Sequence, residues 1–175
     1  VVNEAFDPYW TAGALAVNGS ITSNVSVSAA ADLRGTGSIG GTVGVASGGR
    51  IFPGVTSYPG PINSADEVLT VTGAANLSAG GRLGVLFTQS GTGGVHTQTL
   101  DAGAGITLGG TSALTVAIEA GDYGAIDIVV LKTGGTDTTS TGFASHPTLP
   151  TGWTVEYKTF AGTDCVYDSG TYAVA

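Results

Sequence analysis

The sequence of 175 residues predicts an all-β fold: a single-domain parallel β-solenoid with loop insertions. Apolar residues alternate with polar or small ones in runs such as VSVSA, TVGVA and RLGVLF, and this period of two indicates strands with one buried face. Gly-Gly pairs separate the runs, and glycine suits sharp corners because it reaches positive φ without a Cβ clash. Sets of apolar positions also return at constant offsets, which indicates stacked units.

The offsets predict which residues stack on one another. A shift of 31 carries Leu69 and its apolar neighbours onto Leu100 and its neighbours, and a shift of 18 relates Val25 to Val43. A β-sandwich also has short strands and frequent turns, but it does not predict equal offsets for whole sets of positions. The solenoid is therefore favoured, with this predicted core ladder: Leu69, Leu77, Leu83, Val85, Leu100, Leu108, Leu114 and Val116.

The chain divides into three predicted parts. Residues 1–14 form an N-terminal aromatic cap or docking segment, 15–132 the solenoid coils, and 133–175 a C-terminal loop with a terminal coil or β cap. Units of 31–32 residues are interpreted as 18-residue coils that carry loops, because Gly, Ser, Thr and Pro interrupt the alternation within them. The predicted loops are 54–67, 88–98 and 133–152.

Composition excludes several classes of partner. The formal net charge is −8 with only five basic side chains, so we expect no nucleic-acid partner. No run of about 20 apolar residues exists, so we expect no insertion into a membrane. The single cysteine, Cys165, excludes an internal disulfide framework. The absence of methionine predicts a mature chain whose leader was removed on export, and thus an extracellular or cell-surface location.

One stretch has the form of a nucleotide-binding motif. Gly35-Thr-Gly37-Ser-Ile-Gly40 reads G-x-G-x-x-G, which in a dinucleotide site follows a strand, opens a helix and precedes an acidic residue by about 20 positions. Here an alternating, glycine-interrupted stretch follows Gly40, and residues 41–65 contain no acidic residue. The glycines are therefore predicted to form corners, and no cofactor is expected.

The sequence offers little chemistry. The candidates for an enzyme acting on acidic polysaccharides are His96, Asp122, Asp127, Lys132 and His146. Asp127 lies in the alternating stretch AIDIVVL and is predicted to face solvent, and the two histidines are 50 residues apart without ligand spacing. A calcium ion in a loop, at Asp66-Glu67 or around Glu119–Asp122, is the only metal alternative. We therefore predict no catalytic, cofactor or metal site, and a protein that is not an enzyme.

A family resemblance follows from LRGTGSIGGTVGVASGGRIFPG, VLTVTGAANLSAGGRLGVLF and ITLGGTSALTV. Over about residues 31–118 the chain resembles the passenger-associated strand repeats of bacterial autotransporters and related secreted surface proteins. The resemblance implies a right-handed β-helix, export and a surface role, with no catalytic residues to carry over. Autotransporters continue into a membrane barrel, for which these 175 residues leave no room, so the chain is expected to be a fragment or a free-standing secreted unit.

The N-terminus suggests how such a unit works. Phe6, Tyr9 and Trp10 precede the first alternating stretch, and they either cap one end of the stack or dock on the next subunit. With Tyr172 and Val174 they form the predicted assembly interface. We therefore predict an extracellular structural protein whose copies join head to tail into a filament or surface layer. The alternatives are an adhesin fragment whose loops bind a glycan or host surface and, less favoured, a polysaccharide lyase or hydrolase.

Overall fold

The computed structural model describes residues 13–54, 67–89, 95–118, 130–133 and 143–145, and every regular element in these ranges is a β-strand. In chain order the strands are β1 (Ala14–Ala16), β2 (Ser20–Ile21), β3 (Val25–Val27), β4 (Asp32–Gly35), β5 (Ser38–Ile39), β6 (Val43–Val45), β7 (Arg50–Pro53), β8 (Glu67–Val71), β9 (Ala75–Asn76), β10 (Arg82–Gln89), β11 (Val95–Ala102), β12 (Ile106–Thr107), β13 (Ala113–Ile118) and β14 (Leu131–Thr133).

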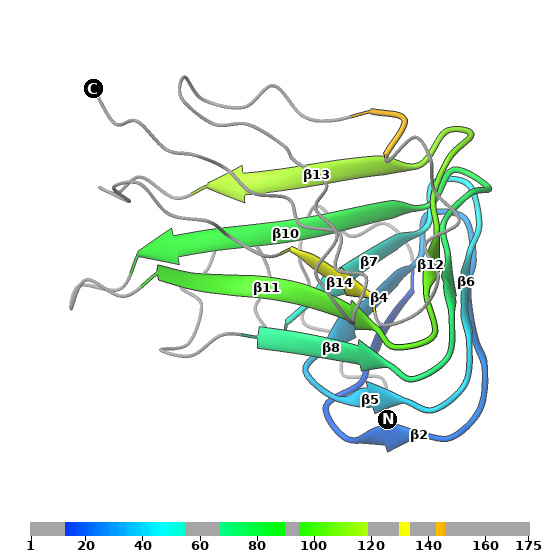
Figure 1. Cartoon of the computed structure of the whole chain (residues 1–175), viewed down its shortest axis with the longest axis horizontal. Coiled ribbons are helices and arrows are strands. Elements are labelled where there is room, and N and C mark those ends of the chain that lie inside the picture. Colours follow the sequence, from blue (N-terminus) through cyan, green and yellow to red (C-terminus); the bar gives the residue numbers. More distant parts are fainter. Residues whose placement is uncertain (1–12, 55–66, 90–94, 119–129, 134–142, 146–175) are drawn as a thin grey trace.

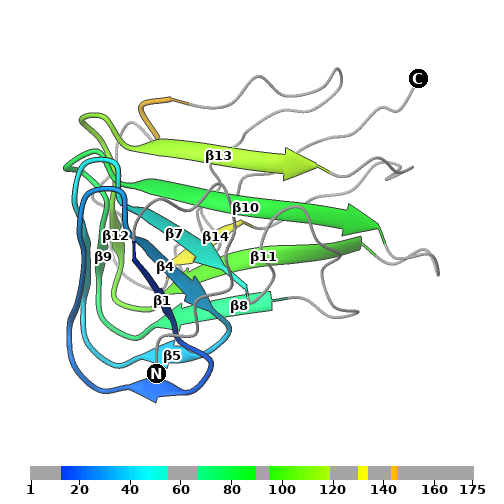
Figure 2. The same ribbon diagram turned by 180° about the vertical axis from the view of Figure 1, so that it is seen from behind.

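The strands form two sheets. A ten-stranded mixed sheet has the order β1-β4-β7-β10-β11-β8-β5-β2, with β13 beside β10 and β14 beside β11. This sheet curls into a half-barrel, and the second sheet, β12-β9-β6-β3, is entirely parallel. Figures 1 and 2 show the half-barrel from two sides, with the strands of the smaller sheet running along one side of the molecule.

The prediction of a simple parallel β-solenoid is wrong. The two longest strands, β10 and β11, pair antiparallel through Phe87 and Thr97, Thr88 and His96, and Gln89 and Val95, and this pair joins the two halves of the large sheet. The predicted loop 88–98 instead supplies the outer ends of both strands. Only five residues separate the strands, a connection short enough for antiparallel neighbours but not for a parallel crossover. The sequence of residues 88–98 did not predict strands, because it is polar and lacks alternating apolar residues.

Apart from this hairpin, the strand pairs are parallel and follow the predicted offsets. Val25 lies opposite Val43 and Leu33 opposite Ile51, both 18 residues apart. Leu69 lies opposite Leu100 and Leu83 opposite Leu114, both 31 residues apart. Equal offsets therefore describe the local pairing correctly, although they do not describe how the two halves of the large sheet are joined.

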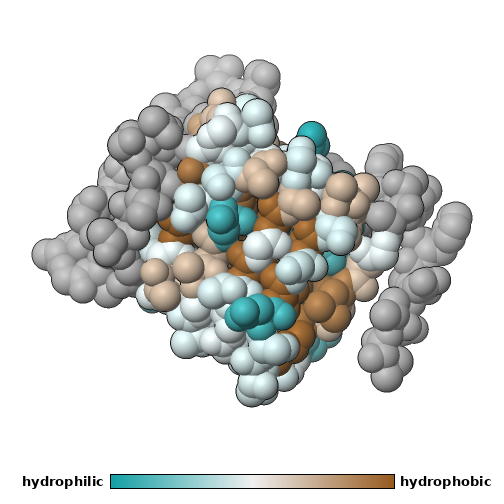
Figure 3. Space-filling view, turned by 90° about the vertical axis from the view of Figure 1, so that its right-hand side faces the viewer, coloured by the Kyte–Doolittle hydropathy of each residue, from teal (hydrophilic) through white to brown (hydrophobic). Residues whose placement is uncertain are grey.

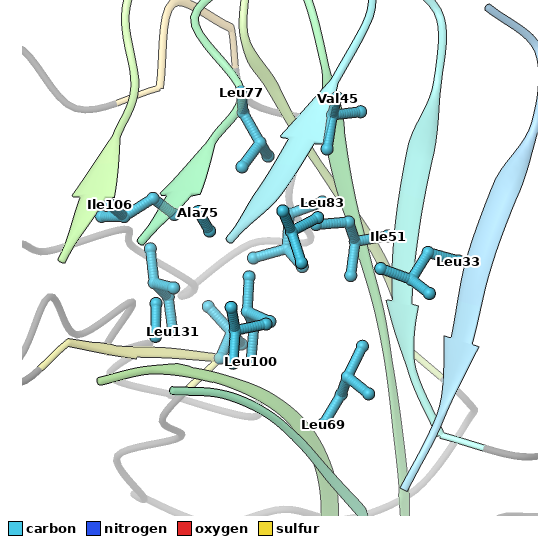
Figure 4. Packing of buried hydrophobic residues seen from close by; sticks show 14 of the residues in the cluster. Leu33, Val45, Ile51, Leu69, Ala75, Leu77, Leu83, Leu100, Ile106 and Leu131 are labelled. Carbon is cyan, nitrogen blue, oxygen red and sulfur yellow. The ribbon is translucent and has the colours of Figure 1, made fainter. Parts of the chain in front are cut away.

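The core lies between the curled sheet and the smaller sheet. Alternate residues of each strand turn inward, so that Leu33, Ile51 and Leu83 lie side by side on three neighbouring strands and are completely buried. Figure 4 shows these side chains facing Ala75 from β9 of the smaller sheet, and Leu77 just after it, across the interior. Most of the described strands bury only one or two apolar side chains, and β10 buries four, so stability depends on the stacking of neighbouring strands.

A buried glutamine marks the point where β10 and β11 separate. Gln98 is the next position after the antiparallel pair of Phe87 and Thr97, and its side-chain oxygen accepts a hydrogen bond from the Leu86 amide at 3.0 Å. Its side-chain nitrogen donates to Glu67 Oε2 at 2.9 Å, on the neighbouring strand β8. Gln98 thus replaces the backbone partner that Leu86 would otherwise have, and it allows the two strands to diverge.

We expect Gln98→Ala to lower the free energy of unfolding by roughly 1–3 kcal/mol, because it leaves the buried Leu86 amide without its acceptor. Urea titration followed by circular dichroism measures the change. Gln98→Glu is the matched variant: it retains an acceptor but sets a second carboxylate against Glu67. Its deficit relative to the parent chain should shrink at acidic pH, where one carboxyl group keeps a proton and can donate it. A deficit independent of pH would contradict the assigned pairing.

Candidate functional site

The first strands of the chain form an open end of the fold. Among the described residues, β1, β2 and β3 each pair with one neighbour only, β4, β5 and β6 respectively. Each strand therefore has one edge whose amide and carbonyl groups are not used in pairing with another strand. Unpaired strand edges are sites where a further strand can add. All three edges lie at the N-terminal end of the sheets (Figures 1 and 2).

The apolar columns are also incomplete at this end. Leu15 continues the column of Leu33 and Ile51, yet it is 41 % exposed while both of those are 0 % exposed. Ile21 and Val25 are half-buried, although the next residues in their columns, Ile39 and Val43, are buried. The open end (β1, β2 and β3 with Leu15, Ile21 and Val25) therefore combines strand edges that pair with no other described strand with apolar side chains in contact with water.

The opposite end of the large sheet is more fully covered. Phe143 is buried in the core cluster, and the Leu114 amide donates to the Ser145 carbonyl at 3.0 Å. The Ala144 amide donates to the Ser112 carbonyl at 2.9 Å, so residues 143–145 lie against the start of β13. Leu114, Ile106 and Leu131 in the last strands are buried. Among the described residues, the two ends of the fold therefore differ in how far their strands are covered.

The predicted assembly residues Phe6, Tyr9, Trp10, Tyr172 and Val174 lie outside the described residues. The eight predicted ladder residues all lie within them. Leu69, Leu77, Leu83, Val85, Leu100, Leu108 and Leu114 are buried, and Val116 is partly buried against the same core cluster. The open end itself, at Leu15, Ile21 and Val25, was not predicted as an interface, although the first members of the apolar columns could have indicated it.

Of the five residues considered for polysaccharide chemistry, two lie within the described residues. His96 is half-buried in β11, opposite Thr88, and Lys132 is exposed in β14 with its ammonium 3.8 Å from Asp101 Oδ2. Asp122, Asp127, His146 and Cys165 lie outside the described residues. Within those residues, no three His, Cys, Asp or Glu side chains gather in a way that would hold a metal ion.

A shallow groove lies on the outer face of the smaller sheet. It encloses about 360 Å³ and is lined by Ser26, Val27, Ser28, Gly44, Val45, Ala46, Asn76 and Ala79. Figure 3 shows the side of the molecule on which this sheet lies, where small polar residues alternate with apolar ones. The groove lining contains no acidic, basic or thiol group, so it provides no acid–base or metal chemistry.

A row of charged residues crosses the outer face of the large sheet. Asp32, Arg50 and Arg82 lie in register on the neighbouring strands β4, β7 and β10. Arg50 binds Asp32 through two hydrogen bonds, Nε to Oδ1 at 2.7 Å and an Nη2 to Oδ2 at 3.2 Å. Burial raises the pKa of the Asp32 carboxyl group above its usual value, while the nearby Arg50 and Arg34 act in the opposite direction. The 18-residue offset between Asp32 and Arg50 could have indicated this pair.

In the residues that the structure describes, these observations define an all-β fold whose first strands form an open end. No family model matches the chain, and a search of the curated proteins gives no match. The resemblance to autotransporter repeats therefore depends on the quoted sequence motifs alone. In the described part of the chain, no helix has the length and apolar character needed to cross a membrane.

Proposed function

We propose that the protein is an exported structural subunit whose copies join end to end into an extracellular filament or surface layer. The observation that carries this proposal is the open end, where the exposed Leu15 continues a column of fully buried side chains. Because Leu15 is 41 % exposed, burying the rest of its side chain against a second copy is favourable by about 1 kcal/mol, and the three strand edges add backbone hydrogen bonds. Export is supported by the resemblance to secreted repeats.

The test compares two exposed apolar residues. Leu15 and Val68 are the large apolar side chains most exposed in the described residues, at 41 % and 37 %, but only Leu15 lies in an edge strand. Leu15→Lys places a charge at the proposed contact, whereas Val68→Lys makes a similar change on β8, which lies between two other strands. Sedimentation velocity over a range of concentrations, with electron microscopy of the same samples, measures assembly.

The parent chain and Val68→Lys should form polymers that grow with concentration, and Leu15→Lys should shift the onset of assembly at least tenfold higher. Circular dichroism shows whether each variant keeps its β structure. Parent samples that stay monomeric at all concentrations would refute the proposal. An equal loss of assembly in the two variants would also refute it, because the loss would then not depend on the open end.

A further inference from the structure

Three of the five basic side chains of this acidic protein gather on one face. Arg34, Arg50 and Arg82 lie on the adjacent strands β4, β7 and β10, and their positions share the outer face because each flanks an inward residue of the core. Neighbouring strands are about 4.8 Å apart, so Arg50 and Arg82 are close enough to repel one another. On β4, β7 and β10 the only described carboxylate is that of Asp32.

The arginines differ in how they are held. Asp32 is fully buried at its side chain and fixes the Arg50 guanidinium, which remains 28 % exposed and lies 5.6 Å from the centre of the Phe52 ring. The Phe52 ring occupies the space above Gly84 that a side chain there would fill. Arg82 is exposed and makes no hydrogen bond or ion pair with any described residue. The face therefore offers one fixed and one available guanidinium beside a half-buried aromatic ring.

We propose that this arginine face (Arg34, Arg50, Phe52 and Arg82) binds the carboxylate groups of an acidic polysaccharide. The planar guanidinium group matches a carboxylate through two parallel hydrogen bonds, and the Phe52 ring gives an apolar surface beside them. Such a surface would attach the subunit to an anionic glycan layer. This inference goes beyond the proposed assembly and does not depend on it, because the arginine face lies outside the open end.

The arginine row suits a narrow anionic partner. A broad anionic surface would also meet the formal net charge of −8 of the rest of the molecule, which opposes binding. A polysaccharide chain is narrow enough to contact the arginine row without contacting the acidic parts of the surface. At physiological ionic strength, protein charges more than about 8 Å from the bound polysaccharide are largely screened. Binding should therefore weaken as salt rises, because it depends on ion pairs at an exposed surface.

The probe is polygalacturonate, with neutral dextran as the control polymer, and isothermal titration calorimetry on the full chain measures binding. Arg82→Ala should weaken polygalacturonate binding roughly tenfold, because it removes hydrogen bonds to a charged group. Arg82→Lys should restore only part of the loss, since an ammonium lacks the planar fork. Lys132→Ala is the matched control: it removes the same charge from an exposed site on β14 and should leave affinity within twofold.

Arg82 is chosen for substitution because it is exposed, whereas replacing Arg50 would leave the buried Asp32 without its partner. Three results would overturn the proposal: no binding of polygalacturonate by the parent chain, equal binding of dextran, or equal losses in Arg82→Ala and Lys132→Ala. If Arg82→Ala alters self-association and not polymer binding, the face contacts another copy and the proposal is also wrong. Leu15→Lys should bind polygalacturonate normally, so failure of the two proposals can be told apart.

Discussion

Leu83→Ala should lower the free energy of unfolding by about 2–5 kcal/mol. Leu83 is completely buried and lies opposite Ile51 on one side and Leu114 on the other. Removing its side chain takes apolar contacts from both neighbours and leaves a cavity that the paired strands cannot close without breaking their hydrogen bonds. Urea unfolding followed by circular dichroism measures the loss, and a fall in the transition midpoint at constant slope identifies it as a change of stability.

Leu15→Ala is the matched control, because it makes the same substitution at the exposed end of the same column. In the monomer it should cost less than about 1 kcal/mol, since Leu15 is already in contact with water. The measurement is made below the concentration at which assembly begins. Equal losses in the two variants would contradict the burial gradient along the column, and with it the assignment of β1 as an open edge.

Gly35→Ala should destabilise the fold by more than about 3 kcal/mol. Gly35 has a φ of 120°, a conformation that costs a non-glycine residue roughly 1–3 kcal/mol. A Cβ atom there would also overlap the backbone of Val17, which cannot move aside as a flexible side chain can. The Gly35 amide donates to the Gly54 carbonyl at 2.7 Å, so a shift of Gly35 would also break a bond to the next layer.

Gly44→Ala is the matched control for Gly35→Ala, made in a strand of the smaller sheet. Gly44 lies in the middle of β6 without a positive φ, and a Cβ atom there would meet nothing within 4 Å. This substitution should change the free energy of unfolding by no more than about 0.5 kcal/mol. Thermal and urea unfolding of the two variants test the contrast. Similar losses in both would mean that glycine content in general, and not the corner at Gly35, limits stability.

The glycine motif illustrates what sequence context predicts correctly. The sequence after Gly40 was predicted to form a strand, and β6 follows there, where a dinucleotide site would have a helix. Gly37 lies so close to Gly19 and Val17 that a Cβ atom would overlap their carbonyl oxygens. These glycines allow successive layers of backbone to approach at a corner, which no side chain would permit.

Polar interior contacts were much harder to predict. Glu67 and Gln98 lie 31 residues apart, as the apolar ladder residues do, but both fell in predicted loops because neither is apolar. Their pairing and the bond from the Leu86 amide depend on β10 and β11 coming together as a hairpin. A pattern search that follows only apolar residues cannot find a polar pair that replaces backbone pairing inside the core.

The sequence by itself determined the strands that alternate apolar and polar residues, their parallel local register and the inward columns, because alternation and equal offsets place the same kind of side chain at the same place in each layer. The tertiary structure alone decided that β10 and β11 join antiparallel, that the large sheet therefore curls into a half-barrel, and that Leu15 ends its column exposed. These features depend on which distant strands come together and on where the stacking stops. The pairing of distant strands and the end of the stack both depend on which strand edges bind one another in the whole fold. A local sequence pattern does not contain this information.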